Sequence, residues 1–174
     1  MRSPFALLSF MLATVLVVAG QRDWIEYHSR EGRYSVSVPG EPKLTSQERT
    51  TPNGKKLQQY LASVLDGTRA FIIGYYDYPA SMTFSFETAR DEMVNRLNGR
   101  LLSEELVRLD GVPASEIRIL AKTQGGTEII DQARFTDIKK RVYLLQCIFP
   151  KDEDGPAVIA KCNRFTESFK LTGQ

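Results

Sequence analysis

The sequence is poor in the residues on which most catalytic and metal sites depend. Its 174 residues include one histidine and two cysteines, too few for the usual zinc ligand sets. His28 has Ser29 beside it, but a serine nucleophile also needs an orienting third group and an elbow such as G-x-S-x-G, which the sequence lacks. We therefore predict no catalytic, metal-binding or cofactor-binding residues and no cofactor.

An excess of charge of either sign is also missing. Lys and Arg number 23 against 21 Asp and Glu, a formal net charge of +2, and few basic residues alternate with aromatic ones. Nothing therefore predicts a nucleic-acid partner or a bulk attraction to anionic membrane. The chain has no internal repeat, low-complexity stretch or second long apolar run, so a single domain is expected.

The one long apolar run lies at the start of the chain. Met1-Arg2 supplies a positive charge, residues 5–18 are almost entirely apolar, and the small residues Ala19 and Gly20 follow. This order is typical of a secretory signal peptide, and the run is shorter than the roughly 20 residues that span a bilayer. The alternative is an uncleaved N-terminal anchor.

The pattern divides the chain into a signal peptide over 1–20 and one domain over 21–174. Gln21 stands where a lipoprotein signal would require cysteine. We therefore expect an exported protein, periplasmic or extracellular, that meets the membrane only through an uncleaved signal segment.

Alternation of apolar and polar residues predicts a series of strands joined by tight turns. Segment 100–109 also fits helical spacing, but Gly99 ends a helix just before it and Asp110-Gly111 follows as a hairpin turn. The polar segment 43–56 is assigned no strand. The predicted strands are 24–28, 33–38, 57–65, 70–78, 100–109, 115–123, 127–138 and 141–149.

Two amphipathic segments predict helices. Ser85 can cap the first, and Asn98-Gly99 ends it in a left-handed turn. Pro156 opens the second at the position that helices tolerate best. The apolar faces are Phe86, Ala89, Met93, Val94 and Leu97 in the first, and Val158, Ile159, Cys162, Phe165 and Phe169 in the second. The expected fold is α+β, a mainly antiparallel sheet meander with two principal helices packed on it.

Three stretches carry a resemblance to known proteins. They are W-I-E-Y-H-S-R-E-G-R-Y-S-V-S-V-P-G-E-P (24–42), Y-Y-D-Y-P (75–79) and F-T-E-S-F-K-L (165–171). The chain resembles a group of small exported bacterial domains related to the PsbP-like α/β/α sandwich. The resemblance implies that fold. Members with known roles are mostly non-enzymatic binders, such as the photosystem II extrinsic subunit, and their partners do not carry over.

The richest local feature for binding is the tyrosine cluster Tyr75, Tyr76, Asp77 and Tyr78. Strand alternation places Tyr76 and Tyr78 on one face and Tyr75 and Asp77 on the other. Tyrosines at a strand end often line a binding rim, because each pairs an apolar ring with a polar tip. The alternative is that they form the edge of the core.

We expect an exported, non-catalytic binding or accessory domain of the cell envelope, with an envelope protein or a small ligand as its partner. Two alternatives remain. One is an enzyme of unrecognised type, a hydrolase built from carboxylates that only the fold brings together. The other is a structural envelope subunit that acts through a sheet edge.

The two cysteines can be placed relative to each other. Cys147 lies about three strand residues, about 10 Å, before the loop that leads to the last helix. Cys162 lies about six helical residues, about 9 Å, past Pro156. If the helix folds back over its own strand, the thiols lie at the same height, so a disulfide is predicted in an oxidising compartment. Two buried free thiols are the alternative.

The start of the chain gives a prediction about processing. The mature protein should begin at Gly20 or Gln21, because a charged start, an apolar run and small residues at the cut coincide there. Mass mapping of the N-terminus of exported protein will measure this, and recovery of intact chains beginning at Met1 in the membrane fraction would show an anchor instead.

Overall fold

The computed structural model describes residues 23–51 and 54–173. The predicted signal peptide and its cleavage site lie outside these residues. Within the described ranges, no helix is long and apolar enough to cross a membrane.

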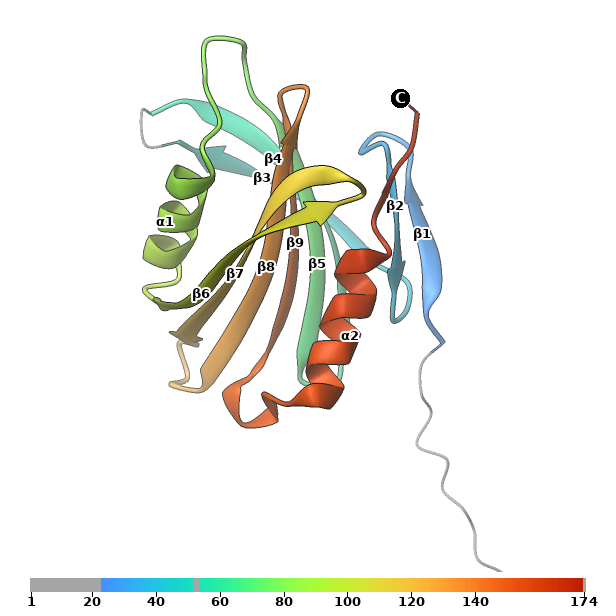
Figure 1. Ribbon diagram of the computed structural model, residues 1–174, viewed down its shortest axis with the longest axis vertical. Coiled ribbons are helices and arrows are strands. Elements are labelled where there is room, and N and C mark those ends of the chain that lie inside the picture. The colour runs from blue at the N-terminus through green and yellow to red at the C-terminus, as the bar shows by residue number, and fades with distance from the viewer. Residues whose placement is uncertain (1–22, 52–53, 174) are drawn as a thin grey trace, which may run out of the picture.

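The strands form two antiparallel sheets (Figure 1). A three-stranded sheet has the order β1-β2-β10, and a seven-stranded sheet has the order β3-β4-β5-β9-β8-β7-β6. The bounds are β1 Ile25–Ser29, β2 Tyr34–Val38, β3 Lys43–Thr50, β4 Lys56–Asp66, β5 Arg69–Asp77, β6 Arg100–Leu109, β7 Val112–Lys122, β8 Glu128–Ile138, β9 Arg141–Pro150 and β10 Lys170–Leu171.

The large sheet consists of two meanders joined at one seam. Strands β3, β4 and β5 form the first meander, and the chain then crosses through helix α1 (Phe86–Arg96) to the opposite edge. Strands β6 to β9 return as the second meander, so β9 pairs antiparallel with β5 from Ala70↔Ile148 to Asp77↔Arg141. The seam brings together residues about 70 positions apart in the sequence.

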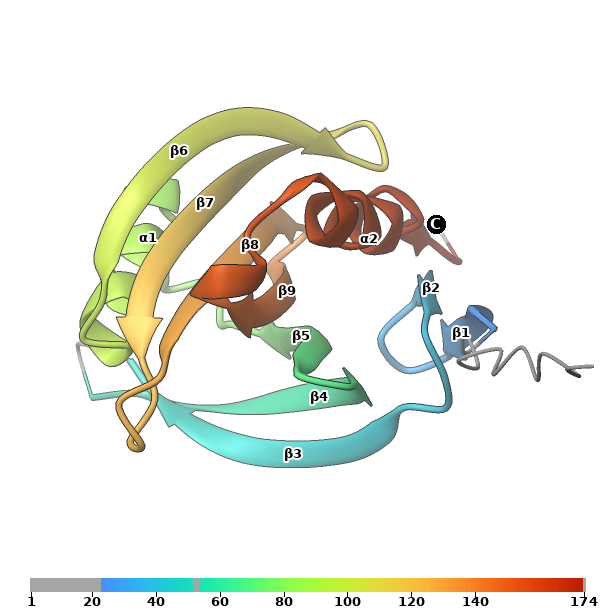
Figure 2. The same ribbon diagram turned by 90° about the horizontal axis from the view of Figure 1, so that it is seen from below.

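Helix α1 covers one face of the curved sheet, while α2 (Pro156–Glu167) and the small sheet cover the other (Figures 1 and 2). The core on the α2 face is the larger of the two and includes Tyr34, Phe71, Phe165 and Phe169. On the α1 face, Met93 packs with residues of β7, β8 and β9. The expected α+β architecture is confirmed.

Both helices begin as the sequence predicts. The Ser85 hydroxyl accepts a hydrogen bond from the backbone N–H of Thr88 at 3.3 Å, which satisfies one free donor of the first turn of α1. Asn98 follows α1 with a left-handed φ of 46°. Pro156 is the first residue of α2, where its missing N–H costs no helical hydrogen bond.

Two strands were missed. Strand β3 (residues 43–50) lies in the segment that was given no strand, because as an edge strand it is largely exposed and shows little apolar alternation. Strand β10 has two residues and is held by pairing with β2. Segment 100–109 is a strand, as predicted.

The disulfide expected between strand and helix is present. Cys147 and Cys162 are bonded, their Cα atoms are 5.5 Å apart, and both residues are fully buried. The bond ties α2 to β9 across the interface of the large core.

Reduction of this bond should lower the free energy of unfolding by about 3 kcal/mol, because it frees a loop of about 15 residues in the unfolded chain. For a chain of this size the melting temperature should fall by about 6–12 °C. Urea unfolding of oxidised and reduced protein measures the difference. A double Cys147→Ala/Cys162→Ala variant is the control and should be insensitive to reductant, while two free thiols in unfolded, unreduced wild-type protein would contradict the pairing.

Candidate functional site

The tyrosine cluster alternates as expected, but its rings are buried. Tyr75 belongs to the core on the α2 face, whereas Tyr76 and Tyr78 pack together on the α1 face. The three residues are only 7%, 9% and 7% exposed, while Asp77 is exposed. The rings therefore form walls of cavities and do not make an exposed tyrosine patch.

Burial fixes how these hydroxyls behave. It raises the pKa of Tyr75 and Tyr76 above the ordinary value. The Tyr78 hydroxyl donates to Oδ2 of Asp137 at 2.8 Å, and burial together with this hydrogen bond raises the pKa of Tyr78 to about 12. At neutral pH all three phenols stay protonated.

Arg141 joins three elements at the upper end of the β5–β9 seam. Its Nε and one terminal nitrogen donate to the two carboxylate oxygens of Asp77 at 2.6 and 2.7 Å. Its other terminal nitrogen donates to the backbone carbonyl of Glu31, in the β1–β2 turn, at 2.8 Å. The hydrogen bonds from Arg141 hold the pKa of Asp77 below its ordinary value. The Arg141 guanidinium and the Asp77 carboxylate therefore serve to hold these elements together.

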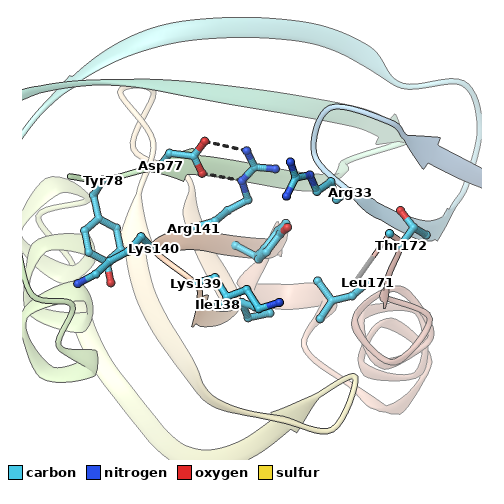
Figure 3. A pocket seen from close by; sticks show the side chains of 11 residues that line it. Arg33, Asp77, Tyr78, Ile138, Lys139, Lys140, Arg141, Leu171 and Thr172 are labelled. Atoms are coloured by element: carbon cyan, nitrogen blue, oxygen red, sulfur yellow. Dashed lines mark hydrogen bonds and ion pairs between the residues drawn. The ribbon is translucent and has the colours of Figure 1, made fainter. Parts of the chain in front are cut away.

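Next to this ion pair lies a cavity of about 290 Å³, which we call the basic cleft (Figure 3). Four cationic side chains and one carboxylate line it, a net charge of +3. Its lining residues are Arg33, Asp77, Tyr78, Ile138, Lys139, Lys140, Arg141, Tyr143, Leu171, Thr172 and Gly173.

Two of the four cations already have protein partners. Arg141 holds Asp77, and the Lys140 ammonium donates to the backbone carbonyl of Met82 at 3.1 Å and lies 5.0 Å from the centre of the Tyr78 ring. Arg33 and Lys139 are exposed and form no ion pair with any residue that the structure describes. These two are therefore the cations available to a bound anion.

Three of the four cations that line the cleft have an unfavourable, left-handed backbone conformation. Lys139 and Lys140 form a two-residue turn between β8 and β9 with φ of 51° and 70°, and Arg33 has φ of 57°. Asn-Gly or Asp-Gly suits such a turn, and a left-handed residue other than glycine costs about 1 kcal/mol or more. The other two non-glycine residues with positive φ in the described ranges, Asn98 and Asp110, follow the usual preferences for a helix end and a hairpin turn.

The sequence pattern alone assigns no site role to Arg33, Lys139 or Lys140. A signal was available, because a two-residue hairpin turn made of lysines departs from turn chemistry. The sequence does not show that these residues converge, because Arg33 precedes β2 of the small sheet, the lysines belong to the large sheet, and the packing of the two sheets is not a local property.

The α1 face holds a different polar feature, the side chain of Asp131 beneath the helix. Asp131 is fully buried, its Oδ2 accepts from the Gln146 amide at 2.6 Å, and its Oδ1 has no partner among the described residues. Burial raises the pKa of Asp131 to about 6, although Gln146 and the positive charge of Arg96 act in the opposite direction.

Three carboxylates that line other cavities are engaged in ion pairs, namely Glu48, Glu92 and Glu128. On the α1 face, Glu92 pairs with Arg49, whose guanidinium lies 5.0 Å from the centre of the Tyr76 ring. Between residues 23 and 173, apart from 52–53, no three His, Cys, Asp or Glu side chains are grouped as metal ligands. His28 is exposed on β1, 3.6 Å from a Glu26 carboxylate oxygen.

Comparison with known proteins identifies the fold. No family model and no curated protein matches the sequence. Among solved structures, the chain is similar to the cyanobacterial PsbP (CyanoP) from Synechocystis sp. PCC 6803, with a TM-score of 0.61, 12% identity, and coverage of 88% of this chain and 95% of that one. The fold is therefore PsbP-like, as the sequence resemblance implied, and at this identity the likeness shows the fold alone.

Two other solved structures share less. The first, from Bacteroides thetaiotaomicron VPI-5482, gives a TM-score of 0.49 at 15% identity. The matched region covers 86% of this chain and 48% of that one. The other is a protein of unknown function from Pseudomonas aeruginosa, described as a putative regulator, with a TM-score of 0.43, 10% identity, and coverage of 75% of this chain and 85% of that one.

The buried carboxyl gives a prediction about pH. Because the pKa of Asp131 is raised from 3.8 to about 6 by folding, its contribution to stability is full below pH 4 and is lost as pH rises through 6. Replacing Asp131 by Asn removes this loss. The free energy of unfolding of D131N relative to wild type should therefore rise by about 2–3 kcal/mol between pH 4 and pH 8.

Urea unfolding at a series of pH values measures this difference, and Asp152→Asn, the same change at an exposed position, is the matched control. Parallel pH profiles for D131N and wild type would show that Asp131 is ionised in the folded protein at the same pH as in the unfolded one.

Proposed function

We propose that this chain is an exported, non-catalytic binding domain and that it binds an anionic group in the basic cleft. The observation that carries the proposal is that the three cations with strained backbone, Arg33, Lys139 and Lys140, all line one cavity. A turn that served only to connect β8 and β9 would be more stable with Asn-Gly. Strain that persists at a cavity supports a role for the side chains there.

The chemistry of the cleft supports binding over catalysis. Its carboxylate, Asp77, is held by Arg141 with a lowered pKa, so it is a weak base at neutral pH. Burial raises the pKa of the Tyr143 phenol, which therefore stays protonated. The cleft offers positive charge and shape, and neither Asp77 nor Tyr143 has a pKa suited to proton transfer at neutral pH.

Export is supported by the signal-like start of the chain and by the buried disulfide, since such bonds persist in oxidising compartments. Exposed leucines on the edge strands favour the alternative of a structural subunit, and Leu44 on β3 is 62% exposed. Leu106 on the edge strand β6 is 82% exposed. The same strand carries Glu104, Glu105 and Arg108, and charges on an edge strand discourage pairing with another chain, so the cleft is the stronger candidate.

The proposal predicts a trade between stability and binding. A Lys139→Asn/Lys140→Gly variant gives the turn its preferred residues and removes two charges. It should melt about 2–4 °C higher than wild type, a gain of about 1 kcal/mol, and bind anions more weakly. Thermal unfolding measures the first effect. Titration of ¹⁵N-labelled protein with sodium acetate and inorganic phosphate, followed by amide chemical shifts, measures the second.

In wild-type protein the shifts should concentrate at residues 33, 139–141 and 172–173 and weaken as salt is added. Arg33→Gln should reduce them without relieving the turn. Arg100→Gln/Lys122→Gln removes two exposed charges outside the cleft and should leave them unchanged. Shifts scattered over the surface, or equal in wild type and the turn variant, would reject the cleft as the site.

A further inference from the structure

The basic cleft has an apolar floor as well as a charged mouth. The Tyr143 ring, Ile138 and Leu171 line it, and all three belong to or pack against the large core. The cleft is thus a place where the upper end of that core reaches the surface beside unpaired cations. A site for a simple inorganic anion would need no such floor.

The apolar floor is held in position. The Tyr143 hydroxyl donates to the backbone carbonyl of Gly32 at 2.8 Å, so the ring presents its carbon atoms to the cleft. Leu171 pairs with Tyr34 in the small sheet, and its N–H donates to a carboxylate oxygen of Asp110 at 2.9 Å. A surface fixed in this way loses little conformational freedom when a ligand covers it.

The two available cations flank the floor. In Figure 3, Arg33 and Lys139 lie on opposite sides of the cavity, and Leu171 and Thr172 lie at its end. Arg33 is beside Arg141, close enough to contribute to the lowered pKa of Asp77. An anionic head between Arg33 and Lys139 would have the apolar residues within reach of the group attached to it.

Given the proposed function, we infer that the ligand is a short amphiphilic anion. A carboxylate or phosphate head binds between Arg33 and Lys139, and an unbranched apolar body lies on Ile138, Leu171 and Tyr143. The cavity of about 290 Å³ is near the lower limit for small-molecule pockets, so the body is short. Both heads satisfy the same cations, and the experiment separates them.

The test is a chain-length series measured by calorimetry and amide shifts on the full mature domain. It carries any tag at the N-terminus, because residues 171–173 line the cleft. Affinity should rise about fourfold per methylene from acetate through butyrate to hexanoate and then level off when the floor is covered. Butanol and hexanol should bind at least tenfold more weakly than the acids of equal length. A comparison of the affinities of butyl phosphate and butyrate identifies the preferred head.

Two variants separate the parts of the site. Lys139→Gln should weaken acetate and hexanoate by the same factor, because it acts on the head. Ile138→Thr should leave acetate unchanged and flatten the rise with chain length, because it acts on the body.

The outcomes distinguish this inference from the proposed function. If acetate and hexanoate bind equally in the cleft, the amphiphile is rejected and the anion site stands. If hexanol binds as tightly as hexanoate, the head is rejected. If no anion shifts the cleft residues, both proposals fail. The hexanoate–hexanol comparison uses wild-type protein and does not depend on whether a variant folds.

Discussion

The pairing of β5 with β9 is the contact on which the rest of the molecule depends. It joins two meanders that are separate in the sequence, and it makes one seven-stranded sheet with two faces to cover. It also places Arg141 opposite Asp77, which fixes the guanidinium that reaches the β1–β2 turn. Without this seam neither the large core nor the cleft would exist, because each takes its residues from both meanders.

The cleft shows a conflict between local preference and global arrangement that the fold tolerates. In most of a protein each residue's own conformational preference agrees with the conformation that the fold imposes. Lysines in a left-handed turn do not follow this rule, and residues of this kind are concentrated at functional sites. The ion pair of Asp77 with Arg141 and the fixed Tyr143 ring supply the rigidity that lets the turn keep this conformation. The free-energy cost of the left-handed backbone is therefore confined to the turn, and the contacts that offset it are made by neighbouring residues of β5 and β9.

Much of the fold was predictable, because periodicity and capping act over a few residues. The helix capped by Ser85, the strand over 100–109 and the bond between Cys147 and Cys162 all follow from local pattern or short loop geometry. Strand β3 was missed because an exposed edge leaves little hydrophobic signal. The tyrosines were placed on the correct faces, but their burial depends on α1, α2 and the small sheet, which pattern alone does not position. Arg33 and Lys139 are more than 100 residues apart, so no local rule could join them.

The pairing of β10 with β2 has a consequence for how the molecule is completed. Leu171 pairs with Tyr34, so the small sheet is complete only when β10, about 135 positions further along the chain, has joined β2. A chain released in order from its N-terminus exposes Tyr34, which is buried in the final structure, until β10 is present to pair with it. Contacts so distant in sequence slow folding. Completion of the small sheet is therefore a late step, and loss of β10 would uncover part of β2 as well.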